Sequence, residues 1–304
     1  MRIVVRLLTL LVLLVVVAGV VVLVPPHLQI RRIEPPLPTA AQLRGLLEVT
    51  NGPTSVSYVD TAVHEFPGRT LGHTVVLIEW ADGRMFMIDA SMDRPAADEF
   101  HETIEILWGE GQGTYSGNIA EILGDDIGRV AGVGFTHLHI DHTQGVAAFC
   151  SARGEGARVY QTRLQAEEHN LHTKQGAEIV AESCLERGAL SEGPLETLDE
   201  FPGLGMVALG GHTPGSTLFV VPVGEHLWLF SGDITNTKSA LLTDEGKGVL
   251  YSYVIVPENT SRTDELRAWL RFLDEQDDMT VVVSHDIVDT RASGMPEYSR
   301  HPSR

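Results

Sequence analysis

The hydrophobic pattern of this chain separates an apolar N-terminal segment from a longer remainder of mixed character. An unbroken apolar run extends from Leu7 to Val24, and Thr9 is the one polar residue within it. Pro25 and Pro26 follow and are expected to end the helix. At ~1.5 Å per helical residue the run is about 27 Å long, close to the ~30 Å of a hydrocarbon core. The pattern therefore predicts one N-terminal transmembrane helix.

A cleavable signal peptide is the alternative interpretation of residues 1–26, because Arg2 and Arg6 form a basic region before the run. The run is longer than the apolar part of a typical signal peptide, however, and no Ala-x-Ala-like site follows it. We therefore expect an uncleaved anchor. Because Arg2, Arg6 and the free amino terminus slightly outweigh Arg31 and Arg32, the N-terminus is expected in the cytoplasm and the large domain outside it.

In the remainder of the chain, strand and helix patterns alternate. Apolar and β-branched runs predict strands at 74–80, 84–89, 129–135, 206–209, 217–222, 227–230 and 279–283. Helical patterns occupy 118–123, 162–172, 175–187 and 263–275. Two strand-rich regions, each followed by helices, indicate a sheet sandwich with helices outside.

These patterns divide the chain into four segments. We expect a membrane anchor at 1–26, a Pro- and Arg-rich linker at 27–39, one α/β domain at 40–289 and a flexible tail at 290–304. The 304 residues are 43% hydrophobic, which suffices for a substantial core and excludes a disordered protein.

Net charge narrows the classes of binding partner, and the two cysteines leave one structural question open. With 22 basic and 41 acidic residues the formal net charge is −19, so the surface would repel phosphate backbones and a nucleic-acid partner is not expected. Cys150 and Cys184 show no metal-ligand spacing. They could form one disulfide in an exported protein or remain two separate buried thiols, and the sequence leaves both alternatives open.

The strongest chemical signal directly follows the strand predicted at 129–135. Residues 136–145 read Thr-His-Leu-His-Ile-Asp-His-Thr-Gln-Gly, so three histidines and one aspartate fall within six positions. Alternate residues of an extended segment point the same way, so His137 and His139 can share one metal ion while Asp141 and His142 serve a second. Imidazole and carboxylate groups are the ligands expected for zinc and its first-row neighbours. A surface loop without a cation would gain nothing from three adjacent imidazoles.

This segment resembles the His-x-His-x-Asp-His signature of the metallo-β-lactamase fold superfamily, and later motifs follow in the order of that family. Residues 210–216 (Gly-Gly-His-Thr-Pro-Gly-Ser) resemble the second motif, 230–233 (Phe-Ser-Gly-Asp) the third and 284–286 (Ser-His-Asp) the last. Residues 87–90 (Met-Ile-Asp-Ala) resemble the early Ile-Asp-x-Gly turn but lack its usual glycine. The resemblance spans about 71–286 and implies the αββα sandwich of that family.

The resemblance also implies a site for two divalent metal ions. Carried over position by position, the expected ligands are His137, His139 and His212 for one ion, Asp141, His142 and His285 for the other, and Asp233 as the bridge. Two ions ~3.5–4 Å apart hold a shared water as hydroxide, which is the expected nucleophile. Asp141 is also a candidate proton donor, and Asp89 is expected to support the ligands rather than bind metal. Zinc is the default, with manganese or iron as alternatives.

A bridging aspartate is typical of the thioesterases, lactonases and phosphodiesterases of this family, whereas its true β-lactamases usually lack one. The sequence departs from the patterns of these family members at two points, and both limit the assignment of a substrate. The lactonases place a tyrosine soon after this aspartate, where Ile234, Thr235 and Asn236 stand here, and the chain ends soon after His285, without the helical domain of the glutathione thioesterases. We expect hydrolysis of an ester, thioester or lactone bond in a small molecule. A phosphodiesterase and a non-catalytic metal-binding membrane scaffold are the alternatives.

The other histidines lack partners at ligand spacing and are expected to be ordinary surface or core residues. They are His64, His73, His101, His169, His172 and His226. Tyr251 and Tyr253 are candidates to reach the substrate, although simple packing is favoured for both. Trp108 and the Gly-rich stretch 109–117 fit either a flap over the site or an ordinary loop.

Overall fold

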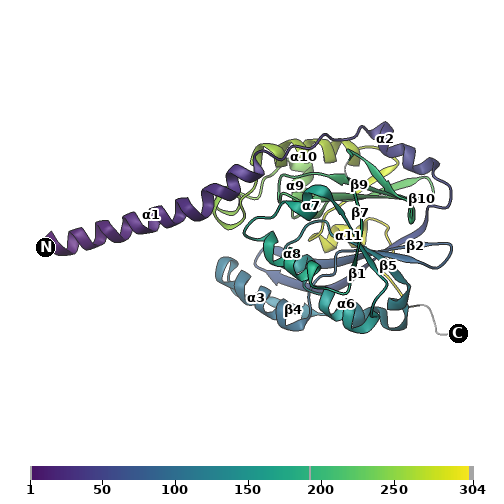
Figure 1. Cartoon of the computed structure of the whole chain (residues 1–304), viewed down its shortest axis with the longest axis horizontal. Helices are drawn as coiled ribbons and strands as arrows, with labels where there is room; N and C mark the ends of the chain where they lie inside the picture. Colours follow the sequence, from purple (N-terminus) through teal and green to yellow (C-terminus); the bar gives the residue numbers. More distant parts are fainter. Residues whose placement is uncertain (1, 192, 301–304) are drawn as a thin grey trace.

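Two β-sheets packed face to face form the centre of the structure, a computed structural model that describes residues 2–191 and 193–300. The first sheet has the strand order β4-β1-β2-β3-β5-β6-β7, and the second has the order β12-β11-β10-β9-β8. Helices cover the outer faces of the sheets, and a long helix projects from one side of the domain (Figure 1). The expected αββα sandwich is confirmed.

Each sheet combines antiparallel and parallel pairs. The first sheet contains β1 (Pro53–Phe66), β2 (Arg69–Trp80), β3 (Met85–Ile88), β4 (Gln112–Tyr115), β5 (Val130–Gly134), β6 (Arg158–Thr162) and β7 (Glu186–Ser191). The second contains β8 (Glu196–Leu198), β9 (Phe201–Ala208), β10 (Thr217–Val223), β11 (His226–Phe230) and β12 (Met279–Val282). Strands β3, β5, β6 and β7 run parallel, as do β11 and β12, so their carboxyl ends share an edge of each sheet.

The helices are mostly short and lie between the strands. After α1 (Arg2–Ile30) they are α2 (Ala40–Arg44), α3 (Arg94–Trp108), α4 (Ile119–Leu123), α5 (Ile140–Thr143), α6 (Val146–Arg153), α7 (Arg163–Glu167), α8 (Thr173–Ala181), α9 (Lys238–Thr243), α10 (Thr260–Asp274) and α11 (Ile287–Ala292). Single turns of tighter or wider helix are η1 (Gly45–Glu48), η2 (Gly124–Arg129), η3 (Gly232–Ile234) and η4 (Tyr251–Ile255).

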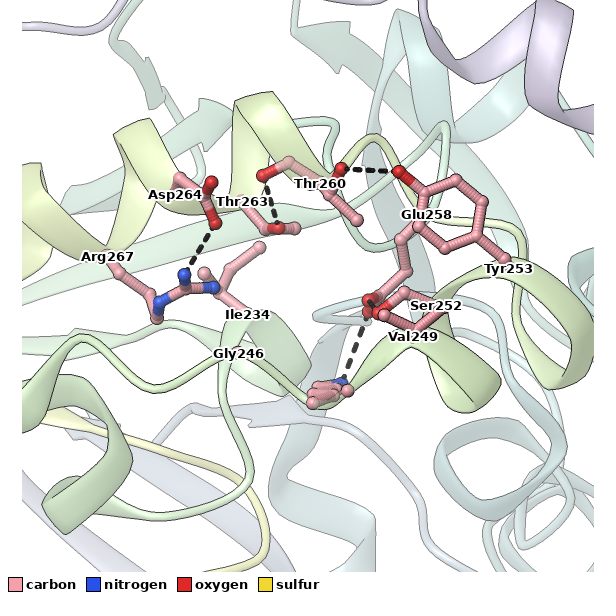
Figure 2. Close-up of a pocket in the computed structure, with 12 residues that line it drawn as sticks. Ile234, Gly246, Val249, Ser252, Tyr253, Glu258, Thr260, Thr263, Asp264 and Arg267 are labelled. Atoms are coloured by element: carbon pink, nitrogen blue, oxygen red, sulfur yellow. Dashed lines mark hydrogen bonds and ion pairs between the residues drawn. The ribbon is translucent and has the colours of Figure 1, made fainter.

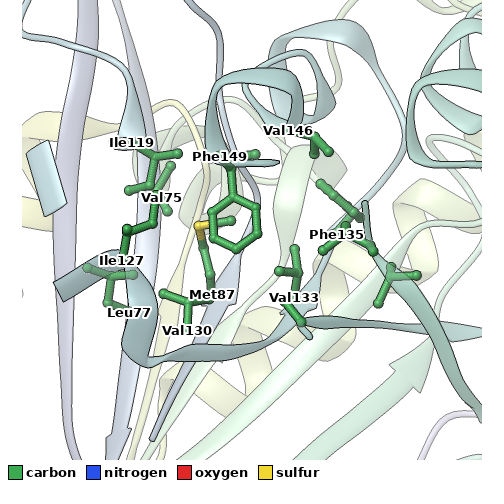
Figure 3. Packing of buried hydrophobic residues seen from close by; sticks show 14 of the residues in the cluster. Val75, Leu77, Met87, Ile119, Ile127, Val130, Val133, Phe135, Val146 and Phe149 are labelled. Carbon is green, nitrogen blue, oxygen red and sulfur yellow. The ribbon is translucent and has the colours of Figure 1, made fainter. Parts of the chain in front are cut away.

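Three layers of apolar side chains hold the sandwich together. The middle layer lies between the sheets and includes Phe86 of the first sheet and Phe219 of the second. One outer layer packs α4, α6 and α8 on the first sheet, where Phe149 of α6 lies over Met87 of β3 (Figure 3). The other packs α10 on the second sheet through residues such as Leu270. Burial of this apolar area is the main stabilising contribution to the fold.

Helix α1 does not end at Pro25 and Pro26, as the sequence indicated, but continues to Ile30. A proline inside a helix costs about 3 kcal/mol, so other contacts must hold the last turn. Ile30 is fully buried against the domain, and Gln29 Nε2 donates to Glu168 Oε2 at 2.8 Å. Tertiary packing therefore overrides the local proline signal. By length and composition α1 could cross a membrane.

The segment predicted as a linker, 27–39, is held against the domain. Its first part belongs to α1, Ile33 is buried, and the carbonyl of Pro35 accepts a hydrogen bond from Arg262 Nη2 at 2.5 Å. The carbonyl of Pro38 accepts another from Trp269 Nε1. This stretch follows α10 rather than spacing the domain away from α1.

The segment predicted as a flexible tail, 290–304, also contacts the domain as far as residue 300. Met295 is buried, the backbone N–H of Tyr298 donates to the carbonyl of Tyr58 at 2.8 Å, and the Tyr298 hydroxyl donates to Asp126 at 2.6 Å. These contacts place the segment along β1. Residues 301–304 lie outside the described part of the chain.

Cys150 and Cys184 form a disulfide, which decides between the two alternatives left open by the sequence. Cys150 lies on α6 and Cys184 between α8 and β7, with a sequence separation of 34. The bond therefore ties together two parts of the outer layer on the first sheet.

Candidate metal centre

The candidate ligands gather where strands of both sheets end. His137 and His139 follow β5, Asp141 and His142 belong to the adjoining α5, and His212 lies between β9 and β10. Asp233 follows β11 within η3, and His285 follows β12. All seven residues that the sequence predicted thus meet at one edge of the sandwich.

Local backbone geometry allows this close approach. Gly232, just before Asp233, has φ of +60°, a conformation that favours glycine. A Cβ atom at this position would lie 2.8 Å from the Cβ of Thr136, so the two ligand-bearing segments could not approach each other as closely with any other residue.

Three imidazoles form the first group of donors. The ligand atoms of His137, His139 and His212 lie within 4.8 Å of one another. His137 Nε2 is 3.0 Å from His139 Nδ1, and the Nε2 atoms of His137 and His212 lie 4.0 and 3.9 Å from Asp233 Oδ2. One cation could therefore contact all three rings and one oxygen of Asp233.

A second group faces the other side of Asp233. His285 Nε2 lies 3.0 Å from Asp233 Oδ2 and 3.5 Å from Asp141 Oδ2. His142 Nε2 lies 3.5 Å from Asp141 Oδ2 and 3.6 Å from Asp233 Oδ1. Asp233 therefore lies between the two groups.

The donor atoms fit divalent metal ions. Among the described residues, Nε2 of His139, His142 and His212 and Oδ1 of Asp233 are buried without a hydrogen-bond partner. Leaving a buried polar atom unsatisfied costs about 1–3 kcal/mol, so several at one point call for a ligand. Nitrogen and carboxylate donors in such a set suit zinc, manganese and iron.

Charge is distributed unevenly over the cluster. Burial lowers the pKa of His137, His139 and His212, which keeps these rings neutral and able to bind metal. Burial also opposes charge on His142, but the carboxylates of Asp141 and Asp89 outweigh it and raise the pKa of His142 to about 10. The pKa of His285 is raised in the same way, where burial is outweighed by Asp233.

Buried carboxylates and a carbonyl orient three of the imidazole rings by accepting hydrogen bonds from the ring nitrogen that faces away from the centre. His142 Nδ1 donates to Asp89 Oδ2 at 2.9 Å, and Asp89 Oδ1 accepts from the N–H of Thr136. His285 Nδ1 donates to the carbonyl of Gly72 at 2.9 Å. In each case the hydrogen bond engages Nδ1 and leaves Nε2 directed at the centre, which fixes the tautomer needed for metal binding.

Glu258 orients the ring of His212 in the same way, and the sequence did not predict this role. Its Oε1 accepts from His212 Nδ1 at 2.6 Å, and its Oε2 accepts from the Ser252 hydroxyl at 2.6 Å. Burial opposes ionisation of Glu258, but Lys247 and His212 lower its pKa overall, so it is a carboxylate. Figure 2 shows Glu258 beside Ser252 at the wall of a separate cavity of about 280 Å³.

His73, expected to be an ordinary residue, lies beside the second group. It comes from β2, and its Nδ1 is 3.7 Å from Asp141 Oδ2. His73, Asp141 and His285 could together hold a metal ion. Within the described part of the chain both ring nitrogens of His73 lack a hydrogen-bond partner, and burial lowers the pKa of the ring. His64 and His101, also expected to be ordinary, belong to none of these candidate groups, but the His64 ring lies against His73 with 5.1 Å between ring centroids, and the Nδ1 atoms of His64 and His101 are 3.0 Å apart.

A cavity of about 380 Å³ opens above the centre. His139, Asp141, Asp233 and His285 are among the residues that line it, and most of its remaining lining is apolar. Tyr251 lines this cavity, whereas Tyr253 lines the cavity of Figure 2. Burial raises the pKa of Tyr251 well above its usual value, so its hydroxyl keeps its proton. Trp108 lies in the wall, at the end of α3.

Comparisons with known proteins agree with this arrangement. The family model described as the metallo-beta-lactamase superfamily matches residues 68–285. No curated protein sequence matches the chain.

Solved structures share the fold at low sequence identity. An N-acyl homoserine lactone hydrolase with its product bound at the catalytic metal centre is 17% identical, with a TM-score of 0.59, over 79% of this chain and 96% of that one. A probable metal-dependent hydrolase from Staphylococcus aureus is 16% identical, with a TM-score of 0.54, over 78% and 91%. A dizinc quorum-quenching lactonase in complex with a product is 13% identical, with a TM-score of 0.52, over 77% and 89%.

Proposed function

The chain belongs to the metallo-beta-lactamase superfamily, and from that premise we propose that it is a dinuclear metal-dependent hydrolase of small-molecule esters, thioesters or lactones. One observation carries the proposal: the Asp233 carboxylate stands between two groups of buried imidazoles. Lactone hydrolases among the structures of the same fold, including one with a dizinc site, support this bond class.

We assign the ligands as the sequence resemblance implies. His137, His139 and His212 would hold one ion, Asp141, His142 and His285 would hold the other, and both ions would share Asp233. Zinc is proposed first, with manganese and iron as alternatives. When bound, two such ions supply Lewis acidity and lower the pKa of a water molecule to near neutrality.

The protein's own groups orient the ligands and the substrate. Asp89 and Glu258 fix the orientations of the His142 and His212 rings by accepting hydrogen bonds from them. The protonated hydroxyl of Tyr251, in the cavity wall, is placed to donate a hydrogen bond to a substrate oxygen. Asp141 also lines the cavity, where it can pass a proton to the leaving oxygen or sulfur. Overall, water adds a hydroxyl to the acyl carbon and a proton to the leaving atom.

We further propose that α1 is an uncleaved membrane anchor and that the hydrolase domain lies outside the cytoplasm. The length and apolar composition of α1 support the anchor. The Cys150–Cys184 disulfide supports the location, because disulfides persist in oxidising compartments and are rare in the cytosol.

The first test measures metal content and turnover together. The full chain, purified in detergent without chelator, should contain about two transition-metal ions and hydrolyse members of an ester, thioester and lactone panel. Asp233→Asn should lose at least one ion and reduce turnover by a factor of at least ~10³ with the fold retained by circular dichroism. Asp277→Asn, at an exposed position before β12, is the matched control and should change neither.

The alternatives predict different outcomes of the same test. Turnover confined to phosphodiesters in the panel would replace the proposed bond class with phosphodiester hydrolysis. Two bound ions without turnover of any substrate would favour a non-catalytic metal-binding scaffold. Unchanged metal content and turnover in Asp233→Asn would refute the bridging role.

A further inference from the structure

The walls of the cavity above the metal centre are built for an apolar ligand. Leu71, Phe100, Ile104, Leu107 and Trp108 line it on one side, and Leu171, Ile255 and Val256 line it as well. The candidate metal ligands His139, Asp141, Asp233 and His285 supply four of its polar lining residues. A substrate that fills this space therefore places a polar, scissile group at the ligands and an extended apolar group along the walls.

Apolar side chains continue from this cavity onto the surface. Ile106 and Leu107 at the end of α3 are 85% and 50% exposed, Leu171 before α8 is 52% exposed, and Leu250 and Val254 around η4 are 65% and 51% exposed. The three segments that carry them also supply residues that line the cavity. Single exposed apolar residues are ordinary, but a group around one opening marks a surface that is covered. We call these five residues the apolar rim.

Helix α1 is fixed to two of the same three segments. His27 Nε2 donates to the carbonyl of Tyr253 in η4 at 3.1 Å, and Gln29 Nε2 donates to the carbonyl of His169, shortly before Leu171, at 3.2 Å. Figure 1 shows α1 leaving the domain on the side where the end of α3 and α8 lie. The helix that would enter the membrane thus starts beside the apolar rim.

The distance available between the rim and the bilayer is small. The apolar run ends at Val24, and α1 remains helical to the buried Ile30, which corresponds to about 9 Å along the helix axis. That is only slightly more than the ~5–8 Å thickness of one polar headgroup layer. Arg31 and Arg32, both exposed, follow directly and are placed to meet lipid phosphates. Residues 246–256 contain no acidic residue although the chain is strongly acidic overall.

We infer that the apolar rim rests on the lipid bilayer and that the enzyme takes its substrate, an amphiphile with a long acyl chain, directly from the lipid. This inference rests on the proposed hydrolase function and on α1 as an anchor. The acyl chain lies along Leu107, Leu171 and Ile255, and the ester, thioester or lactone carbonyl reaches the metal ligands. Hydrolysis releases a long-chain carboxylic acid (a hydroxy acid from a lactone) and leaves any separate alcohol or thiol at the water side.

The contact with lipid is tested without reference to activity. The full chain, carrying Ile106→Cys or Val254→Cys with an environment-sensitive fluorophore, is reconstituted in phosphatidylcholine vesicles that contain lipids brominated along the acyl chain. The native cysteines are paired and do not take the label. The matched control is Phe272→Cys, which replaces a residue 52% exposed near the end of α10. We expect strong quenching at 106 and 254 and little at 272.

The substrate class is tested in the same vesicles. Double substitution Ile106→Asp/Val254→Asp should abolish the quenching of a label at Leu250→Cys and raise by about tenfold the membrane mole fraction of long-chain ester needed for half-maximal turnover, because two apolar contacts with lipid are lost. Metal content should stay unchanged. Phe272→Asp should alter none of these values.

The outcomes separate this inference from the proposed function. Equal quenching at 106, 254 and 272 would overturn the lipid contact, and a doubled particle size in detergent would then identify a second copy of the chain as the cover. Quenching at the rim with equal preference for short, water-soluble esters would overturn the substrate class. Quenching at the rim without any hydrolysis would leave the lipid contact standing, overturn the substrate assignment and refute the proposed function itself.

Discussion

Buried carboxylates and protonated imidazoles balance one another at the metal centre. Asp89, Asp141 and Asp233 are all buried, and in their field the pKa values of His142 and His285 rise even though burial opposes charge on both rings. The proton on His142 supplies positive charge that metal ions would otherwise bring. Binding of the ions must therefore displace this proton.

Proton release is the first expected consequence. Because the pKa of His142 is raised to about 10, this ring is protonated at neutral pH in the metal-free protein, and metal affinity should increase as the pH rises from 6 to 9. Each displaced proton gives about a tenfold gain per pH unit. Calorimetric titration with Zn²⁺ in buffers of different ionisation enthalpy should report one or two protons released at pH 7. Asp89→Asn should shift the release to lower pH, and an affinity independent of pH would contradict this charge balance.

Glu258 gives a second expectation at the same scale. Glu258→Gln keeps the shape of the side chain but weakens the hydrogen bond that orients His212, so zinc affinity should fall about 10–100-fold with the fold retained. Competition with a chromophoric chelator measures the change. Glu275→Gln, at an exposed position after α10, serves as the control. Equal affinities of the two variants would mean that His212 needs no carboxylate behind it.

The sequence pointed to the candidate ligands, which the structure brings together, but not to the residues that orient them. His137, His139, Asp141 and His142 are contiguous, so their spacing carries the signal. Glu258 lies 46 residues from His212, and only the folded path of η4 and α10 brings the pair together. His73 reaches Asp141 from another strand, for the same reason without a local signal.

The sequence predicted the strands that have a regular apolar pattern. It did not predict the strands and helices whose position depends on tertiary contacts. The strands predicted at 217–222 and 227–230 correspond to β10 and β11. Strand β1, the longest, was missed, because polar residues such as Asp60 and His64 interrupt its apolar pattern and are buried only in the folded domain. The helix predicted at 162–172 is in fact the end of β6 followed by the short α7.

The disulfide makes a testable contribution at the scale of elements. Closing a loop with a sequence separation of 34 restricts the unfolded chain and should stabilise the fold by about 2–4 kcal/mol. Cys150→Ala/Cys184→Ala should lower the free energy of unfolding in urea by that amount. Reductant should have the same effect on the wild-type chain and none on the double variant. A change below ~0.5 kcal/mol would show that the bond constrains little of the unfolded state.

At the scale of the whole molecule, the layered architecture followed from the order of strands and helices, while the position of the domain relative to α1 did not. The Pro-rich stretch 27–39 is typical of a spacer by composition. Its backbone instead finds partners in Arg262 and Trp269 of α10, which a local pattern does not contain. The domain therefore packs directly against the end of α1, with no spacer between them.

In the sequence, Cys150 and Cys184 lie between the candidate ligands His142 and His212, so the segment that the disulfide closes belongs to the same domain as the candidate metal centre. On the proposed orientation, this domain is completed only after the chain has crossed the membrane. The enzyme must then take its metal from the outer compartment, whatever the cytoplasm contains. A chelator that cannot enter cells should therefore leave newly made enzyme inactive, and the metal in the surrounding medium should decide which ion it carries.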